Sequence, residues 1–236
     1  SSAASDVYKR QAVTGPSGVG KTTLLATLAG LLEPKGGELT LDGTAPWAAQ
    51  RSDVARRITL TAEDAHVFAT TVLENLRVAN GTLSSQDARA LLRRAGLGDW
   101  LTGLPQGLDT LLSSDATTLS GGERRRLLLA RALAAPAPLM LLDEPGEHLE
   151  AATADRLVAD LLQAGNGAED AEEAEETARG VLLVTHRLSA LESADEVLVL
   201  GIPEPGEPAT IVRRGTHTRL SAQDASYRWS LEHEHG

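Results

Sequence analysis

A glycine-rich stretch near the start of the chain, TGPSGVGKTTLLATL at residues 14–28, has the residue types and spacing of a phosphate-binding loop. It matches the pattern G-x-x-x-x-G-K-[ST] at every fixed position. Such a loop exposes backbone N–H groups to phosphate oxygens, and the helix that follows directs its positive dipole end at the same anion. We predict that a nucleotide binds at Gly15, Pro16, Ser17, Gly18, Val19, Gly20, Lys21, Thr22 and Thr23. The alternative is an ordinary glycine-rich turn between a strand and a helix.

Two further stretches carry residues that could act on a nucleotide. LMLLDE at 139–144 is an apolar run that ends in two acids, as a buried strand at the ligand edge of an α/β sheet would. Asp143 would hold Mg²⁺, directly or through water, and Glu144 would polarise the water that attacks the γ-phosphate. LSGGE at 119–123 places a serine and two glycines at a predicted helix start, which is a second anion-binding end. One nucleotide needs both ends only where two chains pair head to tail around it.

The order of these motifs resembles the nucleotide-binding domain of ABC transporters, from about Ala12 to about Leu231. The resemblance implies an α/β P-loop NTPase fold, with a mainly parallel sheet and a helical signature subdomain, that lacks its first antiparallel strands. It also implies ATP and Mg²⁺ as ligands and ATP hydrolysis as the activity. The implied catalytic residues are Glu144 and His186, the latter as γ-phosphate sensor in LLVTHRL. The implied Mg²⁺ ligands are Thr22, Asp143 and Glu63, and the signature residues that contact ATP across the dimer are Leu119, Ser120, Gly121, Gly122 and Glu123.

The resemblance further implies partners. A second nucleotide-binding domain, identical or different, would pair head to tail with this one around ATP, and GEHLE at 146–150 would form the D-loop between them. Residues 64–76 (DAHVFATTVLENL) would contact a transmembrane domain, which would hold the chain at the cytoplasmic face of a bacterial plasma membrane. GERRRLLLARAL and the closing RRGTH resemble exporter-type domains, and the nearest likeness is to CydDC-type thiol-reductant exporters of cytochrome bd assembly, specifically their CydC subunit.

The chain departs from the family pattern in three places. Glu63 stands where a glutamine is usual, and Glu150 stands where the D-loop usually ends in aspartate. The adenine-stacking aromatic normally lies well before the phosphate loop, and Tyr8 is too close to Gly15 to be it. These departures bear on the stacking of the adenine base and on the timing of the two subunits relative to each other. They bear less on phosphate binding.

Composition narrows the function classes. The net charge of −11 argues against broad nucleic-acid binding, and the absence of cysteine excludes disulfides and thiolate zinc sites. No apolar run approaches the roughly 20 residues that span a bilayer. A soluble ABC ATPase of DNA maintenance would need a long coiled coil, a translation-associated ABC protein would need tandem domains, and a non-hydrolysing partner domain would not need Glu144 and His186. Another ABC exporter, of lipids, peptides or drugs, remains an alternative.

The elements expected to position these residues alternate between helices and strands, which predicts parallel pairing. Helices are expected at 21–32, 71–79, 84–96 (with Ser84 and Ser85 as candidate caps), 120–134 (capped by Ser120) and 150–164, and strands at 38–43, 57–61, 138–142, 181–185 and 197–200. Residues 1–11 are expected to be a foreign or disordered leader, residues 12–231 the domain, with a helical subdomain at about 71–134. Residues 165–179 are expected to form an acidic surface insertion and residues 232–236 a frayed tail.

Overall fold

The computed structural model describes residues 10–61, 65–112, 119–147, 149–163, 179–204 and 206–234. In these ranges six strands form one sheet in the order β2-β3-β4-β1-β5-β6. The strands are β1 (Arg10–Thr14), β2 (Ile58–Leu60), β3 (Leu139–Asp143), β4 (Gly180–Val184), β5 (Glu196–Gly201) and β6 (Thr210–Gly215). The pairs from β2 to β5 are parallel, and β6 runs antiparallel to β5. The predicted α/β class with a mainly parallel sheet is therefore confirmed.

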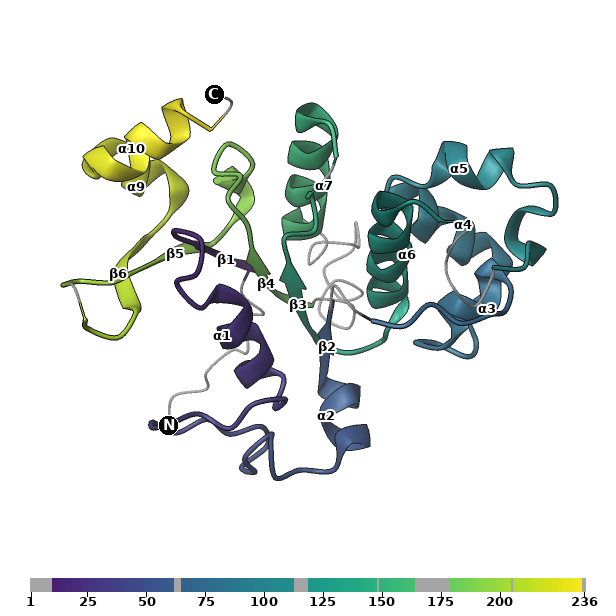
Figure 1. Cartoon of the computed structure of the whole chain (residues 1–236), viewed down its shortest axis with the longest axis horizontal. Helices are drawn as coiled ribbons and strands as arrows, with labels where there is room; N and C mark the ends of the chain where they lie inside the picture. The colour runs from purple at the N-terminus through teal and green to yellow at the C-terminus, as the bar shows by residue number, and fades with distance from the viewer. Residues whose placement is uncertain are drawn as a thin grey trace, which may run out of the picture.

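Helices cover both faces of this sheet (Figure 1). Alternate residues of a strand point to opposite faces, so Leu141 of β3 packs with α1 (Lys21–Leu28) and α2 (Arg51–Arg57). Its neighbours Met140 and Leu142 pack on the other side, with α7 (Ala151–Gln163). Both faces of the central strands are thus buried, which explains why they read as continuous apolar runs rather than alternating ones.

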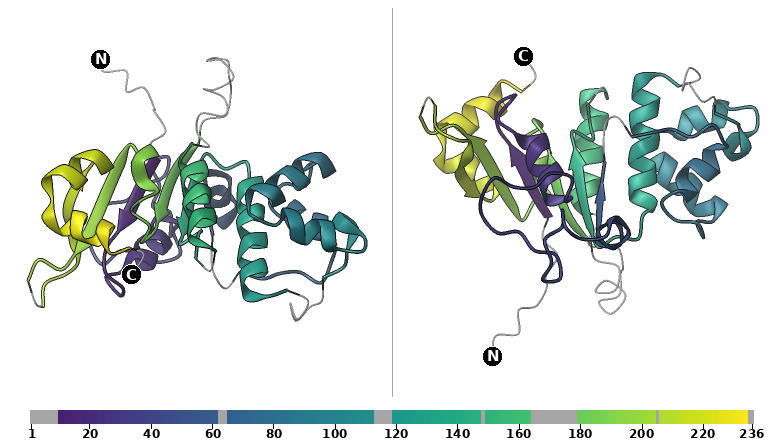
Figure 2. Two further views of the ribbon diagram at one scale, coloured as in Figure 1. Left: turned by 90° about the horizontal axis from the view of Figure 1, so that it is seen from above. Right: turned by 60° about the horizontal axis from the view of Figure 1, so that its bottom comes forward.

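A group of helices stands beside the β2 end of the sheet (Figure 2). They are α3 (Val72–Arg77), α4 (Ser85–Arg94), α5 (Gly98–Gly103) and α6 (Gly121–Ala134), with a short 3₁₀ helix at Gly107–Asp109. Two of the candidate caps are confirmed: Ser84 Oγ accepts from Asp87 N at 3.1 Å, and Ser120 Oγ accepts from Glu123 N at 3.2 Å. Ser85 is instead the first residue of α4. These helices occupy the region expected as the helical subdomain.

The C-terminal part packs against the opposite end of the sheet (Figure 1). It contains a 3₁₀ turn at Leu191–Ser193, then α9 (His217–Gln223) and α10 (Ala225–Glu232). Tyr227 of α10 is buried, and its hydroxyl lies 3.0 Å from His217 Nδ1. β6, α9 and α10 are not among the elements expected from the sequence.

Three expectations need correction. Residues 38–43 are not a strand: Leu41 and Thr44 form an isolated antiparallel bridge around a turn in which Asp42 and Gly43 have positive φ. The predicted Asp-Gly turn is present, but beyond this bridge no described strand pairs with the segment. The first described strand begins at Arg10, two residues before the expected domain start, and Arg10 binds the Asp195 carboxylate. Glu234, which lies in the expected frayed tail, is held in place, because it accepts hydrogen bonds from the backbone of residues 188 and 189.

Several expected features lie outside the described residues: most of the leader, the acidic insertion except Arg179, and the predicted Mg²⁺ ligand Glu63. Among the described helices, none is long and apolar enough to cross a membrane.

Candidate functional site

The phosphate loop lies between β1 and α1, at the carboxyl ends of the central strands. Gly15, Gly18 and Gly20 all have positive φ, at 148°, 76° and 100°, which L-residues with a side chain rarely adopt. At Gly15 a side chain is also excluded by packing, because a Cβ there would lie 2.4 Å from the carbonyl oxygen of Leu200 in β5. A Cβ on Gly18 or Gly20 would meet nothing within 4 Å, so these two positions leave open space over the loop.

The start of α1 is open to an anion. Gly20 is the N-cap residue, in the left-handed conformation, and among the described residues no side chain caps this end. The first N–H groups of a helix have no partner within the helix, so they are available to phosphate oxygens. Lys21 Nζ donates to the carbonyl oxygens of Gly15 (2.9 Å) and Pro16 (3.1 Å). The ammonium group therefore lies over the loop, where phosphate oxygens could replace these carbonyl acceptors.

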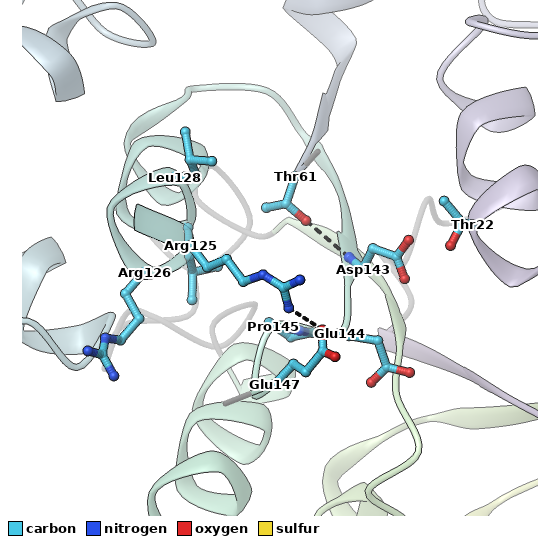
Figure 3. A pocket seen from close by; sticks show the side chains of 10 residues that line it. Thr22, Thr61, Arg125, Arg126, Leu128, Asp143, Glu144, Pro145 and Glu147 are labelled. Atoms are coloured by element: carbon cyan, nitrogen blue, oxygen red, sulfur yellow. Dashed lines mark hydrogen bonds and ion pairs between the residues drawn. The ribbon is translucent and has the colours of Figure 1, made fainter. Parts of the chain in front are cut away.

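Thr22 and Asp143 line one cavity of about 130 Å³, with Thr61 beside them (Figure 3). The Asp143 carboxylate points toward Thr22, and its backbone N–H donates to Thr61 Oγ1 at 3.0 Å. A hydroxyl and a carboxylate are hard oxygen donors, which suit Mg²⁺. No group of three or more His, Cys, Asp or Glu side chains in the described ranges could hold a metal alone. The residues present therefore fit an ion that takes its other ligands from phosphate and water.

Glu144 lies beside the predicted Mg²⁺ ligand and faces the histidine of the LLVTHRL stretch. Its Oε2 is 3.0 Å from His186 Nδ1, and its φ of 44° is unusual for a residue with a side chain. Burial raises the pKa of the Glu144 carboxyl, while His186 and then Lys21 oppose this, and the net pKa lies above its ordinary value. A carboxyl with raised pKa, held by a histidine at the edge of a cavity, is a suitable proton acceptor.

The signature segment lies away from these groups. Ser120 caps α6 in a reciprocal arrangement, since its own N–H donates to Glu123 Oε2 at 2.7 Å. Ser120 and Gly121 are exposed, and Leu119 is buried beneath them. Residues 119–123 do not line the cavity formed by Thr22, Asp143 and Glu144. Within one chain, the structure brings the phosphate loop, both acids and His186 together, but not the signature residues.

Two residues that the sequence analysis did not single out also line this cavity. Arg125 of α6 and Glu147 form an ion pair across it (Figure 3). The pair connects the signature helix to the segment that follows Glu144. An arginine and a glutamate can form an ion pair, but these two are 22 positions apart, and no local pattern in the sequence indicates that they are in contact. His148, in the expected D-loop, lies outside the described residues.

The segment expected to meet a transmembrane domain is held by the signature helix. The side chain of Asn75 is fully buried and binds both backbone groups of Phe68, donating to its oxygen at 3.0 Å and accepting from its nitrogen at 2.9 Å. Arg131 of α6 donates to Asn75 Oδ1 at 2.7 Å and to His66 O at 2.7 Å. Phe68 remains 41% exposed, with the Arg131 guanidinium 5.4 Å from the centre of its ring.

The sequence of this chain is similar to the sequences of known transport proteins. The family model for the ABC transporter matches residues 7–147. The chain is 32% identical over 220 residues to the glutathione/L-cysteine transport system ATP-binding/permease protein CydD of Bacillus subtilis, covering 93% of this chain and 35% of that protein. It is 34% identical over 216 residues to the ATP-dependent lipid A-core flippase of Paraburkholderia xenovorans, covering 92% of this chain and 33% of that protein.

A solved structure gives the same result for the fold. A bacterial Atm1-family ABC exporter with ATP bound matches with a TM-score of 0.77 and 25% identity, over 98% of this chain and 38% of that chain. The chain thus spans about a third of the length of the curated relatives it matches. With the matched family model and the two exporter relatives, the chain belongs to the ABC transporter family, as an ATPase domain of the exporter type.

Proposed function

We propose that this chain is the ATP-driven motor of a membrane exporter, in which two such domains close head to tail on ATP and separate after hydrolysis. One observation carries the proposal. The phosphate loop, Asp143, Glu144 and His186 meet on one part of the chain, whereas the second anion-binding end, at Ser120, is exposed and lies outside their cavity. A second domain that lends its Ser120 end would complete each site.

Each residue then has a defined role. The loop N–H groups and Lys21 bind the phosphates, and Thr22 and Asp143 hold Mg²⁺, with Glu63 as a further ligand. Mg²⁺, when bound, neutralises charge on the β- and γ-phosphate oxygens. Glu144 accepts a proton from the attacking water, and His186 fixes the orientation of that carboxylate and contacts the γ-phosphate. The Ser120 hydroxyl and the α6 N-terminus, from the partner domain, bind the opposite side of the γ-phosphate.

Closure would be transmitted to a transmembrane domain through the segment around Phe68. The exposed aromatic ring offers an apolar contact, and Arg131 connects it to the same helix that carries the signature. This partner would hold the chain at the cytoplasmic face of the plasma membrane. ATP binding would thereby select between two arrangements of the domain pair.

For the cargo, we propose a thiol reductant such as cysteine or glutathione, exported for cytochrome bd assembly. The similarity to CydD supports this class, although it does not single out the CydC subunit. A lipid is the second candidate, favoured by the similarity to lipid A-core flippases. In the reconstituted transporter, glutathione should stimulate ATP hydrolysis, whereas stimulation by lipid A alone would favour the second candidate.

The variant Glu144→Gln tests the shared site. It should lower the hydrolysis rate by about 10²–10⁴-fold, because the proton acceptor is lost. It should retain ATP binding, since the phosphate loop is intact, and accumulate an ATP-bound dimer in gel filtration.

Ser120→Arg in the Glu144→Gln background is the control. It should abolish the dimer without weakening ATP binding to the monomer. A monomer peak for Glu144→Gln with saturating ATP and Mg²⁺, or a dimer that survives Ser120→Arg, would contradict the shared-site proposal.

A further inference from the structure

The short segment after β4 carries His186, so whatever holds this segment determines where the imidazole lies. Thr185 N donates to Val13 O at 3.1 Å, and Thr185 Oγ1 accepts from Arg187 N at 3.0 Å. The Arg187 side chain reaches Asp155 of α7 at 3.0 Å. These contacts restrain the residues on either side of the histidine but do not hold the turn that follows at residues 188–189.

The next contacts come from the far end of the chain. Glu234 Oε2 accepts from Leu188 N and from Ser189 N, both at 3.0 Å. Glu234 Oε1 accepts from the Ser189 hydroxyl at 3.1 Å. One carboxylate thus binds two consecutive backbone N–H groups and a hydroxyl, 45 and 46 positions earlier in the chain. Three hydrogen bonds to one carboxylate restrain both backbone amides and the hydroxyl together, so this contact is a firm anchor.

Glu234 can act as an anchor because the helix before it is itself fixed. Asp224 caps α10 by accepting from Tyr227 N at 2.9 Å, and it also forms an ion pair with Arg213 of β6. Tyr227 is buried, and burial followed by the nearby charge of Glu234 raises the pKa of its hydroxyl, which therefore stays protonated beside His217. The C-terminal helix is thus attached to β6 and α9, and Glu234 extends from it.

The residues that Glu234 holds, Leu188 and Ser189, lie close to His186 in sequence, and Leu188 lies close to the phosphate loop in space. Leu188 is 4% exposed, and it lines a second cavity together with His186 and Gly15 of the phosphate loop. A change in the backbone at residues 188–189 would rotate the preceding turn and move the imidazole relative to the Glu144 carboxylate. Misplacement of a reacting group by about 1 Å can lower a rate by about 10²-fold.

We propose that Glu234 is a positioning residue for hydrolysis: it fixes the backbone of Leu188 and Ser189 and thereby the contact between His186 and Glu144. The inference rests on the proposed roles of those two residues. The C-terminal segment is then part of the catalytic assembly, although it does not touch the nucleotide. Removal of the anchor should affect the chemical step and change nucleotide affinity by no more than about twofold, because the loop N–H groups and Lys21 supply most of the phosphate contacts.

The test compares three variants in the assembled transporter. Glu234→Met keeps the side-chain length but removes the acceptors, and Glu234→Gln keeps an amide oxygen that can accept from two N–H groups. Glu232→Met alters an exposed acid at the end of α10. Glu234→Met should lower kcat for ATP about tenfold with KM within twofold, because the chemical geometry is disturbed. Glu234→Gln and Glu232→Met should stay within about twofold of the original kcat.

Hydrogen exchange provides the structural readout. In Glu234→Met the amides of Leu188 and Ser189 should exchange at least about tenfold faster, while those of α1 should be unchanged. An unchanged kcat for Glu234→Met, an equal loss in Glu234→Gln, or unchanged exchange at residues 188–189 would overturn the proposal. If Glu144→Gln abolishes hydrolysis while Glu234→Met does not alter it, the positioning role alone is refuted. If Glu144→Gln hydrolyses ATP normally, the proposed function fails and the positioning role fails with it.

Discussion

Replacement of Gly15 by alanine tests how the fold builds the phosphate loop. Gly15 has a φ of 148°, and a Cβ there would lie 2.4 Å from Leu200 O and 3.2 Å from Leu200 C. The obstacle is the backbone of β5, which pairs with β1 as far as Val199 and at Leu200 pairs with β6, so it cannot rotate aside as a side chain could. Relief would require the ends of two paired strands to separate.

The expected destabilisation has two parts. A side chain in a conformation that only glycine adopts readily costs about 1–3 kcal/mol. Overpacking against a fixed neighbour costs about 1–3 kcal/mol more. Gly15→Ala should therefore lower the free energy of unfolding by about 2–6 kcal/mol. In a chain of this size about 1 kcal/mol corresponds to about 2–4 °C, so the melting temperature should fall by about 4–24 °C.

Two other glycines separate the contributions. Gly18 has a φ of 76°, and a Cβ there would meet nothing within 4 Å, so Gly18→Ala should cost about 1–2 kcal/mol from conformation alone. Gly36 has neither a positive φ nor a nearby atom, and Gly36→Ala should be neutral or stabilise by up to about 1 kcal/mol. Thermal unfolding of the nucleotide-free chain measures all three. If Gly15→Ala is no more destabilising than Gly18→Ala, the packing of the loop against β5 does not limit this position.

Three further predictions concern binding, pH and the segment around Phe68. Lys21→Ala should abolish tight ATP binding, measured by calorimetry, because the loop loses the cation that reaches the outer phosphates. Glu144→Gln should stabilise the chain in EDTA at neutral pH but not below pH 4.5. The pKa of the Glu144 carboxyl is raised in the folded chain, so the original chain loses stability as pH rises above the ordinary pKa of 4.5. The glutamine amide does not ionise, so the variant does not lose stability in this way. Urea midpoints across pH would show this difference, and parallel curves would contradict it. Asn75→Ala should lower the free energy of unfolding by about 2–4 kcal/mol, because the Phe68 N–H and the Arg131 guanidinium lose a buried acceptor, and urea unfolding would measure it.

The parts of the site that could be predicted from sequence are those specified by neighbouring residues. The loop at Gly15–Thr22, the two acids at the end of β3, and the Ser120 cap each depend on residues within a few positions of one another. Local patterns also located the buried strands, because strands covered on both faces are continuously apolar. The expected strand at 38–43 shows the limit: ELTLDG alternates as a strand does, but pairing requires a neighbouring strand, which alternation does not supply.

Contacts between distant residues were not predictable in this way. Nothing in the sequence around Arg125 or Glu147 indicates that these two residues form a pair. An acidic residue near the end of a chain is ordinarily solvated. Local pattern therefore predicts a frayed tail at residues 232–236, whereas Glu234 holds the segment after His186. Such contacts depend on how α6 and α10 pack, and packing is decided by the whole core rather than by local pattern.

Helix α6 links the features on which the proposed cycle depends. Its first turn carries the exposed Ser120 end, which would bind a partner's ATP. One turn later Arg125 contacts Glu147, just after the acid that would activate water. Two turns further Arg131 holds the backbone of Asn75 and its side chain, beneath the exposed Phe68. Because a helix of 14 residues moves nearly as one body, a partner domain that pulls on Ser120 would shift both the catalytic cavity and the Phe68 surface. The same helix would thus couple dimer closure to chemistry and to the membrane partner.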